Sequence, residues 1–186
     1  MQRFATSTEY LKALSLNPDL AVVSIAMAAE CRGVGRATIE RQLAVNGLGG
    51  LMIGKTRCVL ARDLIALNQH DQDQIAKVRQ FVEAYAVQGR SVFYEPVMNA
   101  IGMKPSIPRH RLQIGVILGQ VSRQTWAEHR ILLSVLVHKK TAGTTRPSDS
   151  FFDLVRDVQH PEYDDDTDID AFIDAEMQKV WEHYMG

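Results

Sequence analysis

Cysteine is scarce in this 186-residue chain, and its two cysteines are poorly placed for metal chemistry. Cys31 and Cys58 stand apart from any His or Cys at metal-ligand spacing, and each lies where a small apolar core residue would serve. The six histidines show no i, i+4 pairing of the kind that binds zinc on a helix. The sequence therefore predicts no metal site and no cofactor, and it fits a reducing compartment.

Long apolar runs are missing as well. No stretch approaches the ~20 apolar residues that a membrane-spanning helix requires, and residues 1–3 are not followed by the apolar core of a secretory leader. No grouping of Ser, His and an acid can be assembled from the sequence either. We therefore predict a cytoplasmic protein with no membrane partner and no catalytic residues.

The net charge of −1 hides an uneven distribution along the chain. Residues 20–66 carry six Lys and Arg against three Asp and Glu, and residues 67–156 carry twelve against seven. From residue 157 onward ten acids meet one lysine, Lys179. The basic residues up to position 156 suit a polyanionic partner such as DNA. The acidic C-terminal region could compete with DNA for these residues or form a separate binding segment.

A pair of short helices is the best-defined pattern. Apolar residues recur at helical spacing over 24–31, and this helix should end at Gly33, which readily adopts the left-handed conformation of a helix end. A second helix is predicted over 36–43, with Ile39 and Leu43 facing inward. The short connection between them is typical of a helix-turn-helix.

A small hairpin should follow these helices. Two brief apolar runs, 51–53 and 58–60, flank a tip that carries Lys55 and Arg57. A further helix over about 62–68 would close the unit. The segments that carry a family resemblance are Ala28-Ala29, 33–39 (GVGRATI), 53–57 (IGKTR) and 62–64 (RDL).

These segments resemble the MerR-type or excisionase-like winged helix-turn-helix DNA-binding domain. In that family the second helix enters the major groove and the hairpin, or wing, lies on the neighbouring backbone. Gly35 stands here where the family commonly has a capping Ser or Thr, and residues 48–51 replace a Pro-bearing segment. The resemblance implies groove contacts from Arg36, Thr38, Arg41 and Gln42, and phosphate contacts from Lys55 and Arg57.

A competing motif overlaps the hairpin, because residues 49–56 match the phosphate-binding loop pattern G-x-x-x-x-G-K-T. A phosphate cradle needs a strand before the first Gly and a helix after the Thr, so that backbone donors converge on the phosphates. Here a helix is expected before Gly47 and a strand over 57–60. The hairpin is therefore preferred, and a P-loop nucleotide-binding enzyme is kept as an alternative.

The rest of the chain predicts a mainly helical second domain. A polar hinge is expected over 68–74, and the longest helix over 109–126 should form the centre of the core. The β-branched run 131–138 predicts a buried strand. Shorter helices are expected from a Thr6–Glu9 capping box through Leu14, and over 75–87, 94–101 and 151–158.

A final amphipathic helix follows an acidic, solvated run at 164–166, with Thr167 or Asp168 as its cap. So many large apolar residues on one side require a partner surface, either on the chain's own second domain or on another protein, and dimerisation is the preferred form. The stripe comprises Ile169, Phe172, Ile173, Val180, Trp181 and Tyr184.

The second half faintly resembles the DNA-binding domain of alkylguanine alkyltransferases and alkyltransferase-like proteins, through Tyr94, residues 109–111 and residues 132–138. The Pro-Cys-His-Arg acceptor of that family is absent, so alkyl transfer is not expected. A basic helix start on a solvated face explains the same residues more simply. The secondary DNA-binding candidates are Arg109, Arg111, Lys139 and Lys140.

Together these patterns predict a mainly α protein with small β elements: a winged helix-turn-helix head over 1–70, a mainly helical α+β domain over 71–160, and an acidic linker with an amphipathic helix over 161–186. The expected partner is double-stranded DNA, which the protein would bind as a transcriptional regulator, an excisionase-like factor or an architectural protein. A homo-oligomer or a protein partner is expected through the C-terminal helix. The alternative to DNA binding is a protein-interaction or inhibitor role, such as that of a phage anti-defence factor.

Overall fold

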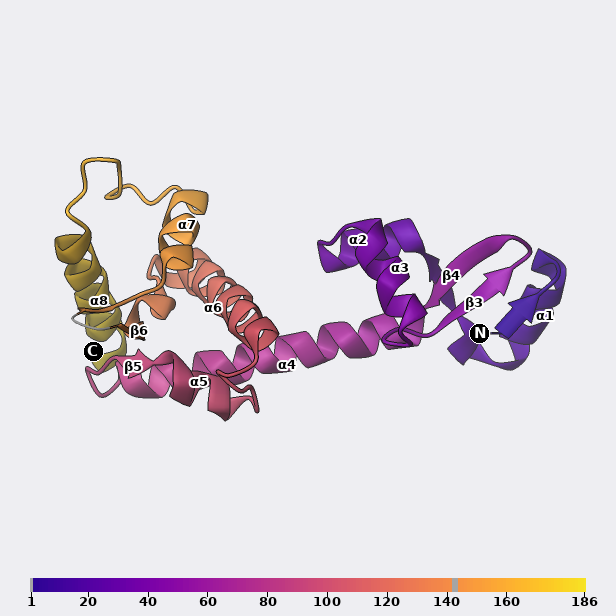
Figure 1. Cartoon of the computed structure of the whole chain (residues 1–186), viewed down its shortest axis with the longest axis horizontal. Helices are drawn as coiled ribbons and strands as arrows, with labels where there is room; N and C mark the ends of the chain where they lie inside the picture. The colour runs from indigo at the N-terminus through magenta and orange to yellow at the C-terminus, as the bar shows by residue number, and fades with distance from the viewer. Residues whose placement is uncertain (1, 142–143) are drawn as a thin grey trace. The chain divides into compact units, whose positions relative to one another are not determined.

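A computed structural model describes residues 2–141 and 144–186, and the chain divides into two compact units after Gln72. The described elements are mainly helices with two small sheets (Figure 1), which confirms the coarse fold class predicted from the sequence. No helix in these ranges combines the length and apolar character needed to cross a bilayer.

The first unit is built on a four-stranded sheet of order β1-β3-β4-β2. The predicted hairpin forms its centre, with β3 and β4 antiparallel and Leu51 opposite Cys58. The two outer strands were not predicted from the sequence: β1 is parallel to β3, and β2 is antiparallel to β4. The unit contains β1 (Gln2–Phe4), α1 (Ser7–Leu16), a 3₁₀ turn (Pro18–Leu20), β2 (Val22–Ser24), α2 (Ile25–Arg32), α3 (Arg36–Ala44), β3 (Gly50–Ile53) and β4 (Thr56–Leu60).

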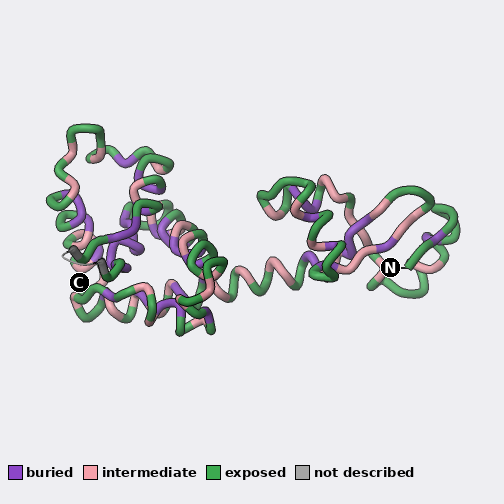
Figure 2. The backbone as a smooth tube through the Cα atoms, in the orientation of Figure 1, coloured by how far each residue is buried: buried purple, intermediate pink, exposed green. Residues whose placement is uncertain are grey.

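Both faces of this sheet are covered, because side chains alternate along β4. Cys58 and Leu60 pack with residues of β1 and α1, whereas Val59 packs between α2 and α3. Buried positions therefore run along the centre of the unit (Figure 2). Cys58 is buried as expected, but the expectation of a core position for Cys31 is wrong, since it lies exposed on α2.

The helix ends in the first unit follow from local chemistry. The Ser24 hydroxyl accepts from the Met27 N–H at the start of α2, and Gly33 ends this helix at a φ of 59°. The start of α3 has no side-chain cap, because its cap position is Gly35. Thr6 caps α1 by accepting from the Glu9 N–H, as the capping box predicts.

Helix α4 (Ala61–Ala86) is the longest in the chain at 26 residues, and it corrects the predicted hinge at 68–74. These residues are polar but include no Gly or Pro, so nothing in them breaks the helix. Arg32 on α2 contacts this stretch. Its Nη1 donates a hydrogen bond to Asn68 Oδ1 at 2.7 Å and forms an ion pair with Asp71 Oδ2 at 2.6 Å.

The second unit encloses one apolar core between its helices and a small sheet of order β5-β6-β7. Fully buried side chains from α4, α6 and the segment after α6 form its centre, including Val78, Ile114 and Leu132. The elements that follow α4 are β5 (Val92–Phe93), α5 (Tyr94–Ala100), α6 (Pro108–His129), a 3₁₀ turn (Leu133–Leu136), β6 (Val137–Thr141), β7 (Thr144–Arg146), α7 (Asp149–Asp157) and α8 (Ile169–Met185).

The predicted strand over 131–138 is wrong for most of its length, because residues 133–136 form the 3₁₀ turn and β6 begins at Val137. Side chains of α6 satisfy the backbone here in place of a sheet ladder. Ser122 Oγ accepts from the Ser134 N–H at 2.8 Å, and Thr125 Oγ1 donates to the Ile131 carbonyl at 2.9 Å. A β-branched apolar run is equally suited to this buried turn.

Helix α8 belongs to the second unit. Asp168 caps it by accepting from the N–H groups of Asp170 and Ala171. Phe172, Ile173 and Val180 are buried in the core that α4 and α6 also form. The apolar stripe therefore packs on the chain's own second unit, which is one of the two surfaces predicted for it.

Candidate functional site

The groove residues that the resemblance implies all lie on α3. Arg36 and Arg41 are exposed, whereas Thr38 and Gln42 are half-buried. Gln42 Oε1 is shielded from solvent and has no hydrogen-bond partner among the described residues. The two arginines are thus the side chains of α3 best placed to reach a partner.

Ion pairing separates the cations of the first unit into two groups. Arg32 pairs with Asp71, and Arg62 lies near Asp19 and Asp63. Among the described residues, no ion pair forms at the other six cations, which are Arg3, Lys12, Arg36, Arg41, Lys55 and Arg57. Arg36 and Arg41 on α3, and Lys55 and Arg57 on the hairpin, therefore keep an unpaired positive charge.

The hairpin tip is held by the first strand of the unit. Gly54 adopts a φ of 58°, and its N–H donates to the Phe4 carbonyl at 2.9 Å. Lys55 follows at the exposed end of the hairpin, while Arg57 is half-buried with its Nε shielded and unpartnered among described groups. Lys55 is accordingly the more accessible cation of the two.

The P-loop-like segment 49–56 does not form a strand–loop–helix. It contains β3, the tip and the start of β4, so no helix N-terminus follows Thr56. The first glycine of the pattern has another role, because the Gly49 N–H donates to Asp63 Oδ2 at 2.7 Å and a Cβ would overlap that oxygen. Both glycines of the motif are explained by the hairpin and its packing.

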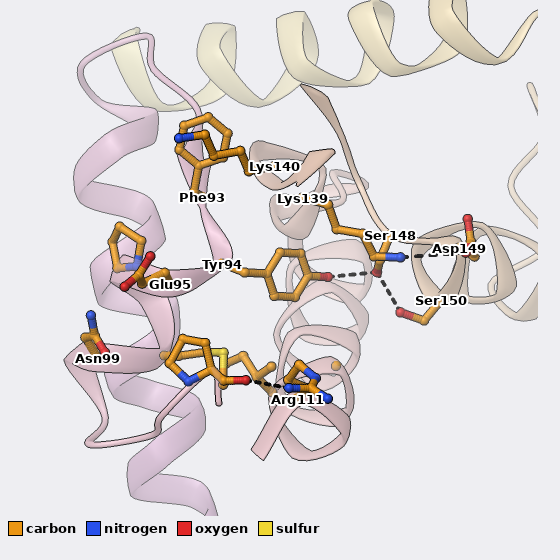
Figure 3. A pocket seen from close by; sticks show the side chains of 15 residues that line it. Phe93, Tyr94, Glu95, Asn99, Arg111, Lys139, Lys140, Ser148, Asp149 and Ser150 are labelled. Atoms are coloured by element: carbon orange, nitrogen blue, oxygen red, sulfur yellow. Dashed lines mark hydrogen bonds and ion pairs between the residues drawn. The ribbon is translucent and has the colours of Figure 1, made fainter. Parts of the chain in front are cut away.

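The basic candidates of the second unit do not all lie together. Arg111, Lys139 and Lys140 line one cleft of about 800 Å³, whereas Arg109 is exposed and does not line it. The cleft lies between α5, the first turns of α6, β6 and the start of α7 (Figure 3). Its other lining residues are Phe93, Tyr94, Glu95, Pro96, Met98, Asn99, Pro105, Ile114, Gly115, Ser148, Asp149 and Ser150.

Three hydroxyl groups are linked across this cleft. Tyr94 Oη lies 2.7 Å from Ser148 Oγ, which lies 2.8 Å from Ser150 Oγ (Figure 3). Burial raises the pKa of Tyr94, although its hydrogen bond with Ser148 opposes the shift, so the phenol stays protonated at neutral pH. The sequence singled out Tyr94 but offered no signal for the two serines, which lie 54 or more positions away.

A second polar cluster is buried near α8. His160 Nε2 lies 3.2 Å from Glu176 Oε1, and this oxygen also accepts from Lys179 Nζ at 2.8 Å. Desolvation lowers the pKa of His160, because the nearby Glu176 carboxylate offsets only part of the cost of burying charge. No local sequence pattern signals this cluster, because His160 and Glu176 lie 16 positions apart and meet only in the folded chain. Within the ranges that the structure describes, no three His, Cys, Asp or Glu side chains gather to hold a metal ion.

Comparisons with protein-family models, curated proteins and solved structures give no match for this chain.

Proposed function

We propose that the first unit is a winged helix-turn-helix that binds double-stranded DNA, with α3 in the major groove and the β3–β4 hairpin against the backbone. The observation that carries the proposal is the unpaired charge of Arg36, Arg41 and Lys55 on these elements. Phosphates supply the neutralising charge that the unit itself lacks, and their counterions are released on binding.

The packing of the two helices supports this proposal. Gly33 turns the chain between α2 and α3, and Ala28, Ala29, Ile39 and Leu43 bury the sides that face each other. With Ile39 and Leu43 fixed inward, α3 offers its exposed side to a groove without unfolding. A rigid helix of 9 residues with arginines at positions 1 and 6 can place a guanidinium on a guanine edge.

The hairpin has a different role in the proposal. Lys55 stands at a tip that the Phe4 carbonyl fixes, so it can contact a phosphate at little entropic cost. A lysine on a phosphate positions the protein but does not select a base sequence. We therefore assign specificity to Arg36 and Arg41, and general affinity to Lys55 and Arg57.

Fluorescence anisotropy with labelled duplex DNA of random sequence, measured between about 50 and 200 mM salt, tests the proposal. Log Kd should rise linearly with log salt concentration, and Lys55→Ala should flatten the slope by about one for each lost phosphate contact. Lys77→Ala is the matched control, because Lys77 is an exposed cation on the part of α4 that belongs to the second unit. Binding that is absent, or equally weakened by Lys77→Ala, rules out the proposed surface.

Selection of a preferred site from the random pool then separates the two roles. Arg36→Ala and Arg41→Ala should cost about 1–3 kcal/mol on the preferred site and broaden the selected sequences. Lys55→Ala and Arg57→Ala should weaken preferred and random DNA alike. Unchanged affinity in all four variants would disprove the assignment of these residues.

A further inference from the structure

The cleft in the second unit has the size of a small-molecule site. Its volume of about 800 Å³ falls within the ~300–1,000 Å³ typical of ligand pockets. Apolar side chains supply much of its wall, and among them Phe93 keeps 41% of its surface exposed. Pro96 and Pro105 also line it, so the cleft can accept a flat apolar body.

The hydroxyl chain leaves one donor unused. Tyr94, Ser148 and Ser150 contribute three O–H hydrogens, and two of these are spent in the two hydrogen bonds of the chain. No further acceptor for the third hydrogen is found among the described residues. The chain therefore presents an O–H to the cleft, which favours a ligand that brings an acceptor oxygen.

Cations lie on two sides of this chain. Lys139 extends toward Ser148, and Arg111 lies on the other side of Tyr94 in Figure 3. Lys139 Nζ lies 3.6 Å from Asp149 Oδ2. Both side chains are exposed, so this ion pair contributes little stability, and an anionic ligand can replace Asp149 as the partner of Lys139. Arg111 donates to the Pro105 carbonyl at 2.6 Å but forms no ion pair with a described carboxylate. A negatively charged group on the ligand would complement both side chains.

Gly115 keeps the cleft open. It lies inside α6, where glycine costs about 0.5–1 kcal/mol relative to alanine. A Cβ at this position would meet nothing nearer than Ser150 Oγ at 3.9 Å, so neighbouring packing does not require glycine. A larger side chain there would occupy the cleft.

We propose that this cleft binds a small organic anion, with a flat apolar body against Phe93, Pro96 and Pro105 and a carboxylate or phosphate beside the hydroxyl chain, Lys139 and Arg111. The inference concerns the second unit alone and does not depend on DNA binding by the first. It assigns a ligand site to residues that the sequence suggested only as secondary DNA-binding candidates or as a solvated basic surface.

Calorimetric titration of the full chain with two anions and their neutral counterparts tests the proposal. Adenosine monophosphate and adenosine form the phosphate arm, and 1-naphthoate and 1-naphthylmethanol form the carboxylate arm. At least one anion should bind with a Kd below about 1 mM, and its neutral counterpart should bind about tenfold more weakly or not at all. The arm that responds identifies the anionic group. Absence of binding by both anions, or equal binding of the neutral compound, overturns the inference.

Variants locate the site. Gly115→Leu should reduce affinity about tenfold or more, whereas Gly115→Ala adds little bulk and should bind within about threefold of the original chain. Lys139→Gln and Arg111→Gln should each weaken binding about fivefold, with Lys77→Gln, an exposed cation on α4 outside the cleft, as the matched control. If Gly115→Leu does not fold, Tyr94→Phe and Arg111→Gln decide the outcome. Unchanged affinity in the folded cleft variants places the ligand elsewhere and overturns the assignment.

Discussion

His160 Nε2 lies 3.2 Å from Oε1 of Glu176, and the two side chains are 2% and 0% exposed. Trp126 and Phe172 pack against the imidazole ring. The second carboxylate oxygen of Glu176 is buried without a hydrogen-bond partner among the described residues, so only Oε1 receives the donors of His160 and Lys179. Because one oxygen of this buried carboxylate is unsatisfied, the stability of the cluster is sensitive to any change of charge on its side chains.

The second unit should lose stability as the pH falls through the titration range of histidine. Burial lowers the pKa of His160 and of His138, so each takes up a proton more readily in the unfolded chain. Their contribution to stability is complete above an unfolded pKa of about 6.5 and is lost as the pH falls below it. The melting temperature should therefore decline between about pH 7 and 5, and His160→Gln should reduce that decline. A pH-independent melting temperature across this range would contradict the prediction.

The effects of substitutions at Gly49 and Asp63 on the free energy of unfolding should be coupled. Gly49→Ala forces the Asp63 carboxylate away, because the new Cβ overlaps Oδ2 and lies 2.8 Å from Leu60 Cδ1. The expected cost is about 1–3 kcal/mol in the free energy of unfolding, measured by urea denaturation. In the Asp63→Ala background the same substitution should cost less, because the oxygen is gone.

Gly35→Ser serves as the control for this prediction. A side chain at position 35 meets nothing within 4 Å, and its φ is −70°. A serine hydroxyl there can cap α3, so the variant should be neutral or more stable by a few tenths of a kcal/mol. Equal costs for Gly49→Ala in both backgrounds would show that Asp63 is not the neighbour that matters.

The elements of the first unit that could be predicted are those with local signals. Gly33 ends α2 and the apolar runs around Lys55 pair as a hairpin, because turn chemistry and short-range periodicity specify both. Strand β1 could not be predicted, since three residues gain their structure only by pairing with β3, 49 positions further on. Short strands of this kind carry no periodicity of their own.

The cleft of the second unit could not be predicted from local sequence signals either. Tyr94, Arg111 and Lys139 were singled out from the sequence, but no local pattern predicted that they share one cleft with Ser148, which lies before α7. The pairing of Val92 with Val137 and the packing of α7 on α6 bring these segments together. Contacts between distant segments depend on tertiary packing, which neither composition nor periodicity encodes.

ATP with Mg²⁺ should leave the melting temperature unchanged, although residues 49–56 match the P-loop pattern. Thr56 begins β4, so the segment lacks the helix N-terminus that would complete a phosphate cradle. A ligand that binds only the native state raises the melting temperature, which differential scanning fluorimetry detects. Lys55→Ala should give the same result as the original chain. An ATP-dependent rise that Lys55→Ala abolishes would overturn the assignment of Lys55 to a DNA-contacting wing.

Removal of residues 168–186 should unfold the second unit rather than merely change its oligomeric state. The deletion takes Phe172, Ile173 and Val180 out of the core and exposes the apolar surface beneath them. The single substitution Phe172→Ala should already cost about 3–5 kcal/mol. The exposed Asp174→Ala, on the same helix, should stay within about 0.5 kcal/mol of the original chain. Light scattering after size exclusion should show aggregation of the truncated chain, and circular dichroism should show loss of helix. A truncated protein that remains soluble, with an unchanged melting temperature, would show that α8 contributes nothing to the core, contrary to the burial of its apolar stripe.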